Sequence, residues 1–150
     1  MTELFGSILV ISAGIIIGQI KSDKLKKRCE TSLLAEKMLR DIYIMLESLF
    51  LTRDEIFERL EKNKNYACFY DLFHGKTKAD FPAENDIKEL REFFSSLGTN
   101  DINGELMKTR LCLERLSEST KEAQEKYRKC NKLYKALGGL TGAAVVIMLI

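Results

Sequence analysis

The sequence has few of the residues that make turns. It contains only one Pro (Pro82) and 9 Gly in 150 residues, and it also lacks Trp. A β-sandwich or barrel needs many tight turns, so this composition argues against both folds and favours helices. Charged residues make up 31% and hydrophobic residues 45% of the chain. That balance argues against disorder and predicts a folded, all-α protein of one modest domain.

Motifs for catalysis and metal binding are also missing. The sequence contains no GxxxxGK[ST], GxGxxG, HExxH, GxSxG or CxxC pattern. His74 has no second His with which to form a metal site or a relay. Four cysteines without metal-site spacing are typical of reduced, mostly packed thiols: Cys29, Cys68, Cys112 and Cys130. We therefore expect no enzymatic activity, cofactor, metal or small-molecule substrate.

Charge is nearly absent from both ends of the chain. All 24 Lys and Arg lie between Lys21 and Lys135, and the only ionisable side chain outside those limits is Glu3. Residues 4–20 are uncharged and about long enough to span a bilayer, which takes roughly 20 residues. A secretory signal would carry positive charge before its apolar run, whereas here the positive charge follows it. Residues 4–20 are therefore predicted to be an uncleaved transmembrane helix.

The apolar stretch at the other end predicts a second transmembrane helix over residues 133–150. It is short for a span, although Lys132 and Lys135 can extend toward the interface. Basic side chains lie on the inner flank of both apolar segments: Lys21, Lys24, Lys26, Lys27, Arg28, Lys129, Lys132 and Lys135. The positive-inside rule then places both termini outside the cell membrane and residues 21–132 in the cytoplasm. Phospholipid head groups explain these charges more simply than nucleic acid does.

Each predicted transmembrane helix carries a pair of glycines at a spacing of four. Gly14 and Gly18 form one small-xxx-small pattern, and Gly138 and Gly142 form the other. Because Gly18 and Gly138 lie at the same sequence distance from the basic flanks, we predict equal depth in the membrane. The glycines could pack against each other or against another membrane protein, and the sequence leaves both alternatives open.

Between these segments, apolar residues recur at helical spacing. The pattern predicts a long helix over residues 23–50, a short helix capped by Thr52, and a helix over residues 84–97 that stops at Gly98. Residues 76–82 are expected to form a surface loop. The aromatic cluster at residues 66–73 could be core or a partner contact, and core is the favoured interpretation.

The last helix, from Asp101 onward, carries a heptad pattern typical of coiled coils. Its positions alternate steps of four and three: Ile102, Leu106, Thr109, Leu113, Leu116, Thr120, Ala123, Tyr127, Cys130, Tyr134 and Leu137. Small and polar members weaken this heptad seam, which favours packing inside a bundle. The sequence as a whole predicts an antiparallel bundle of about six helices, flanked by N- and C-terminal transmembrane helices.

Three stretches resemble the stage III sporulation protein AB family of endospore-forming bacteria. They are NKLYKALGGLTGAAVVIMLI, SLGTNDINGELMKTRLCLERL and LESLFLTRDEIFERL, together with the apolar N-terminal run. Residues 61–84 show no such likeness, and Arg53 stands where the family pattern would have Pro. The resemblance implies a mother-cell membrane protein of the assembly that links mother cell and forespore. It also implies a bundle similar in fold to the cytoplasmic domain of type II secretion and type IV pilus platform proteins.

The expected function is therefore that of a non-catalytic scaffold. It would dock a secretion-type cytoplasmic ATPase and other membrane subunits of the sporulation assembly. The alternatives are a platform protein of a type II secretion or type IV pilus system and a membrane-anchored helical sensor. The sequence does not indicate the oligomeric state, so a homo-oligomer stays open, and it does not identify the partner-binding face.

Overall fold

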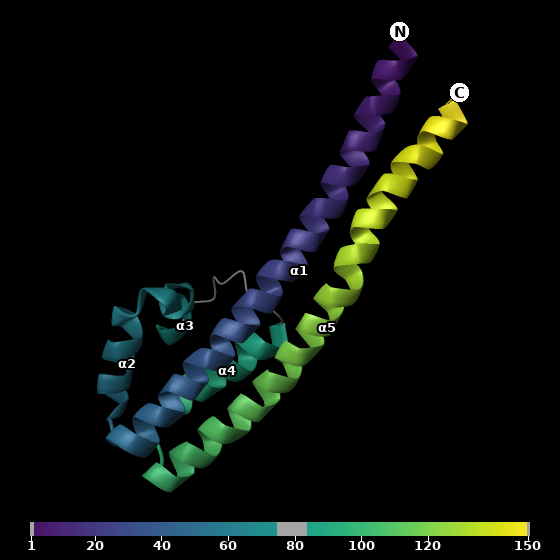
Figure 1. Cartoon of the computed structure of the whole chain (residues 1–150). Coiled ribbons are helices and arrows are strands. Elements are labelled where there is room, and N and C mark those ends of the chain that lie inside the picture. The colour runs from purple at the N-terminus through teal and green to yellow at the C-terminus, as the bar shows by residue number, and fades with distance from the viewer. Residues whose placement is uncertain (1, 75–83, 150) are drawn as a thin grey trace. The chain divides into compact units, whose positions relative to one another are not determined.

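The computed structural model describes the backbone of residues 2–74 and 84–149 (Figure 1). Side chains are described from Ile16 to Leu133, apart from residues 17 and 75–84, and also at residues 136 and 140. The loop predicted at residues 76–82 lies outside the described residues. The chain divides into two compact units. One comprises residues 1–27 and 123–150, and the other comprises residues 28–122.

The described part of the chain is all-helical, as predicted. The elements are α1 (Thr2–Leu49), α2 (Arg53–Lys62), the 3-10 helix η1 (Lys64–Phe69), α3 (Tyr70–Phe73), α4 (Glu84–Ser96) and α5 (Ile102–Leu149). The number of helices differs from the prediction of about six in a bundle with two more flanking it. The predicted segment 4–20 is not a separate helix, because it is the first part of α1. Residues 133–149 end α5, as the sequence led us to expect of the last helix, and α1 and α5 have 48 residues each.

The unit of residues 28–122 encloses one hydrophobic core. The buried side chains come from every helical element of this unit, for example Met38 of α1, Ile56 of α2, Phe69 of η1, Leu72 of α3, Leu90 of α4 and Leu116 of α5. Burial of such side chains contributes roughly 1.5–3 kcal/mol each, which is the main force holding short helices such as α2 in place. The long helices α1 and α5 therefore contribute buried side chains to this core.

The predicted aromatic cluster belongs mainly to this core. Tyr66, Phe69 and Leu72 are buried, and Phe73 packs against them from a half-buried position. The Phe73 ring lies edge-on to Phe94 of α4, with ring centres 4.9 Å apart, an arrangement that aromatic pairs prefer. The core interpretation is confirmed for these four residues.

In the unit of residues 1–27 and 123–150, the first and last helices run side by side (Figure 1). The Ser22 hydroxyl donates a hydrogen bond of 2.6 Å to Oδ1 of Asn131. The Asn131 amide in turn donates to the Tyr127 hydroxyl at 3.3 Å. Because Ser22 is buried, this hydrogen bond satisfies a polar group that would otherwise destabilise the helix pair.

Among the residues that the structure describes, no helix is both long enough and apolar enough to cross a membrane. Most residues of the two predicted spans, 4–20 and 133–150, have side chains that lie outside the described part.

Candidate interaction sites

A cavity of about 510 Å³ opens in the unit of residues 28–122, where α1 ends and α5 begins. We call it the end cavity. Its walls come from the end of α1, the start of α2 with the residues just before it, the turn after α4, and the start of α5. The lining residues are Leu46, Leu51, Thr52, Arg53, Asp54, Ile56, Leu97, Gly98, Asn100, Ile102 and Glu105. Its volume falls within the roughly 300–1,000 Å³ typical of ligand-binding pockets. The end cavity is therefore large enough to take part of a ligand or of a partner protein.

Two chain reversals build the walls of the end cavity. At the first, α1 ends at Leu49 and Phe50 adopts a left-handed conformation with φ of 48°. Thr52 then begins α2, and its backbone N–H donates a 2.8 Å hydrogen bond to the Glu55 carboxylate. This is the capping box that the sequence predicted. The backbone hydrogen bond from Thr52 also holds the pKa of Glu55 below its usual value.

The second reversal joins α4 to α5. Gly98 has a φ of 83°, which suits glycine because it lacks a Cβ atom. A Cβ atom built there would lie 3.0 Å from Cβ of Arg53, so the two reversals approach each other closely. The Asp101 carboxylate then accepts from the backbone N–H of Gly104 at 3.3 Å, near the start of α5. The stop at Gly98 follows the sequence prediction, and the Asp101 side chain caps the first turn of α5.

Glu105 contributes the buried charge of the end cavity. The residue is only 4% exposed, and its Oε1 atom accepts from the Asn100 backbone N–H at 2.9 Å. Its other oxygen, Oε2, is buried and has no hydrogen-bond partner within the part of the chain that the structure describes. Most buried polar atoms in folded proteins have a partner, so this oxygen is an exception that needs an explanation.

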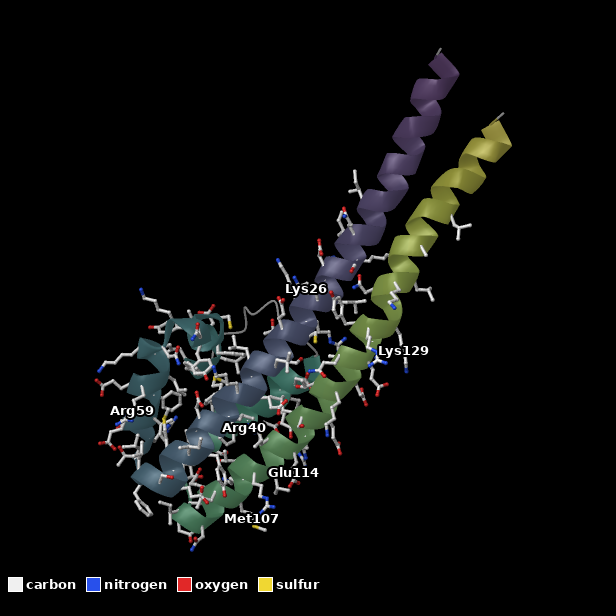
Figure 2. The ribbon with its side chains drawn as sticks, in the orientation of Figure 1. Lys26, Arg40, Arg59, Met107, Glu114 and Lys129 are labelled. Atoms are coloured by element: carbon white, nitrogen blue, oxygen red, sulfur yellow. The ribbon has the colours of Figure 1, made fainter. Side chains whose placement is uncertain are left out.

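A shallower groove of about 220 Å³ lies between α4 and α5. The Arg115 guanidinium donates to the Glu89 carboxylate across it at 3.1 Å. Cys112 is buried at its floor, and burial, together with the nearby Glu89 carboxylate, raises the pKa of its thiol to about 12. This thiol is therefore protonated at neutral pH. Met107, also on α5, is 69% exposed (Figure 2).

The predicted membrane-interface side chains are solvent-accessible where the structure describes them. Those exposed are Lys21, Lys24, Lys26, Lys27, Lys129 and Lys132, while Arg28 is half-buried. Lys129 pairs with Glu125 of the same helix at 3.2 Å, an exposed pair of small energetic value. Figure 2 shows Lys26 and Lys129 on α1 and α5. Lys135 lies outside the described side chains.

Of the four predicted packing glycines, the structure describes only the surroundings of Gly18, which is buried. Gly14, Gly138 and Gly142 lie outside the described side chains. The predicted packing of the two glycine pairs therefore stays a prediction.

The heptad positions of α5 differ in burial along the helix. Thr109, Leu116, Thr120 and Ala123 are buried, and Leu106 and Leu113 pack against the core from half-buried positions. Ile102, at the start, is 39% exposed and lines the end cavity. Tyr127 and Cys130 are half-buried, whereas Tyr134 and Leu137 lie outside the described side chains.

The sequence analysis did not single out Phe50 or Glu105. Helical periodicity assigns a glutamate between apolar positions to the surface, and it gives no sign of a left-handed Phe at a helix end. A weak signal exists for Glu105, because it follows the turn residues Asn100 and Asp101 by five and four residues, close to the three-residue spacing of a capping box. That signal predicts a hydrogen bond but not burial.

No group of His, Cys, Asp and Glu side chains able to hold a metal ion occurs within the described residues. All four cysteines are free thiols: Cys29 and Cys112 are buried, Cys130 is half-buried and Cys68 is exposed. The arrangement of helices, core and cavity defines an all-α helical-bundle protein.

Comparison with known families identifies the particular family. The family model described as stage III sporulation protein AB matches residues 46–150, which include α2 to α5. The chain belongs to this family and is a sporulation-related protein. No curated protein and no solved structure matches the chain.

Proposed function

We propose that the protein is a non-catalytic membrane component of the assembly that links mother cell and forespore. In this function it is a scaffold whose bundle docks a secretion-type cytoplasmic ATPase, while its terminal helices bind other membrane subunits. The observation that carries the proposal is the family match over residues 46–150, because it includes the end cavity and the whole of α5.

The proposed topology is a hairpin in the mother-cell membrane. Residues 4–20 and 133–150 cross the membrane, both termini lie outside, and residues 21–132 face the cytoplasm. The placement of all basic residues between Lys21 and Lys135 supports this topology. The hydrogen bond between Ser22 and Asn131 supports it too, because it joins the first and last helices close to those basic flanks.

In this proposal the glycine pairs are the sites where transmembrane helices pack. Glycine at a spacing of four lets two helix backbones approach closely, which strengthens van der Waals packing in lipid. The pair Gly138 and Gly142 lies on one face of α5, whereas Gly139 points to a different face of the same helix by its position in the sequence.

The test is a double substitution, Gly138→Ile and Gly142→Ile, in the chromosomal gene of the sporulating organism. We expect fewer heat-resistant spores and lower recovery of the ATPase and membrane subunits with the tagged full-length protein. Gly139→Ile is the control, because it adds one isoleucine side chain outside the pattern, and each single variant, Gly138→Ile and Gly142→Ile, is compared with it. Normal sporulation and normal recovery of partners with the double variant would contradict the scaffold function of these helices.

A further inference from the structure

Glu105 holds a carboxylate oxygen that no side chain or backbone group among the described residues satisfies. Its Oε2 atom is buried and unpaired although the residue lines a cavity of about 510 Å³. A buried carboxylate is stable only when donors or a positive charge compensate its lost hydration. Because Glu105 lines the end cavity, a rotation of its side chain would turn this oxygen toward a donor held there.

The nearest basic residue of the cavity wall does not supply this donor. The guanidinium carbon of Arg53 lies 5.3 Å from the centre of the Phe57 ring, in a cation–π contact. Arg53 is also the only cation among the lining residues, against the two carboxylates of Asp54 and Glu105. The charge balance of the end cavity is negative, which favours a cationic occupant.

The remaining walls suit the aliphatic part of a basic side chain. Leu46, Leu51, Ile56, Leu97 and Ile102 are apolar lining residues. Arginine and lysine have long aliphatic stems that pack on apolar surface and charged ends that seek a polar partner. An apolar wall with a single buried carboxylate therefore suits a side chain that has an apolar stem and a charged end. It suits a small inorganic cation less well, because such a cation requires several oxygen ligands.

Exposed hydrophobic side chains stand next to the end cavity. Phe50 is 71% exposed and immediately precedes Leu51 of the cavity wall, and Leu49 is 49% exposed. Phe50 also adopts its left-handed conformation without the glycine that this conformation favours. Aromatic side chains beside a pocket are common anchors in protein interfaces, so the occupant is expected to belong to a protein.

We propose that the end cavity binds an arginine or lysine side chain of a partner protein, with its charged group on Glu105 Oε2 and its stem between the apolar walls. The proposal rests on the proposed scaffold function in one respect, namely that the basic side chain belongs to a partner protein. It assigns the docking contact to one end of the core of residues 28–122.

The experiment uses the full-length protein in detergent micelles, with Phe50 replaced by 4-fluorophenylalanine as a fluorine NMR reporter. The probe is N-acetyl-arginine amide, and its neutral counterpart is N-acetyl-citrulline amide, which has nearly the same shape. We expect a saturable shift of the fluorine signal with the arginine probe and at least about tenfold weaker binding of the citrulline probe, because charge-assisted hydrogen bonds are much stronger.

Glu105→Gln should weaken binding of the arginine probe by at least about tenfold. The matched control is Glu114→Gln on the same helix, because Glu114 is 65% exposed and pairs with Arg110. Equal binding of the two probes, unchanged binding in Glu105→Gln, or no saturable shift at all would overturn the proposal, the last of these indicating a cavity filled by water alone. If Glu105→Gln does not fold, as judged by its thermal melt, the comparison of the two probes in the unsubstituted protein decides.

These outcomes are separate from those of the scaffold test. Loss of the arginine effect with normal recovery of the ATPase would remove the cavity proposal and leave the scaffold function intact. Specific binding of the arginine probe by a protein that recovers no ATPase would support the cavity proposal and contradict the scaffold function.

Discussion

The hydrogen bond between Tyr66 and Asp41 offers a direct test of how the core is held together. Tyr66 is only 1% exposed, and its hydroxyl donates to Oδ2 of Asp41 at 2.5 Å. A hydrogen bond to a charged acceptor contributes about 1.5–3 kcal/mol. Asp41 is half-buried, so water can partly replace the lost donor. We therefore expect Tyr66→Phe to destabilise the protein by about 1.5 kcal/mol, near the lower limit.

The same pair predicts a pH dependence at high pH. Burial, and then the hydrogen bond to the Asp41 carboxylate, raises the pKa of Tyr66 above its usual value of 10.0. The folded protein thus keeps the Tyr66 proton where the unfolded chain loses it. The stabilisation from this proton is fully present below pH 10 and is lost as the pH rises above that value. The stability of Tyr66→Phe should therefore fall less steeply above pH 10 than that of the unsubstituted protein.

The assay is thermal unfolding of the full-length protein in detergent, followed by circular dichroism between pH 7 and pH 11. A loss of about 1.5 kcal/mol corresponds to a fall of about 5 °C in Tm for a protein of this size. Tyr70→Phe is the control, because Tyr70 is 46% exposed and should change Tm by less than about 1 °C. Equal Tm values for the two variants, or equal pH profiles for Tyr66→Phe and the unsubstituted protein, would refute the reasoning.

Two further predictions concern the reversal at Gly98 and the thiols. Gly98→Ala should lower stability by about 1–2 kcal/mol, because φ is 83° and the added Cβ meets Arg53; Gly98→Asn should cost less, and equal melting of all three proteins would contradict this. Iodoacetamide at pH 8 should modify exposed Cys68 well before Cys112, because Cys112 is buried and its pKa is raised to about 12. Mass spectrometry of the native protein checks this order, and equally fast modification of both thiols would show that the α4–α5 groove opens readily.

Local signals in the sequence were sufficient where the physics is local. The Thr52 capping box and the glycine stop at Gly98 both occur where residue type alone indicates them. The burial of Tyr66 and Phe69 also followed from their apolar character in a small helical domain. The cap and the stop depend on backbone geometry and hydrogen bonds within a few residues, whereas the burial of the aromatic residues was predicted only from their apolar character.

The continuity of α1 was not predicted, whereas the last helix was expected to run from Asp101 into the apolar end of the chain. A change from apolar to charged composition indicates a change of environment, and we expected a helix boundary between residues 20 and 23. The backbone hydrogen bonds of a helix do not depend on what its side chains contact. The structure accordingly continues each helix through the change in composition.

By itself the sequence determined the all-α class, the caps, the apolar ends and the resemblance that the family match confirms, because composition, periodicity and short motifs carry that information. Only the tertiary structure brought Glu105 beside Leu46 and Arg53, buried its carboxylate and left one oxygen unpaired. The physical reason is that burial depends on packing among segments far apart in the chain, to which the local pattern around a glutamate is insensitive.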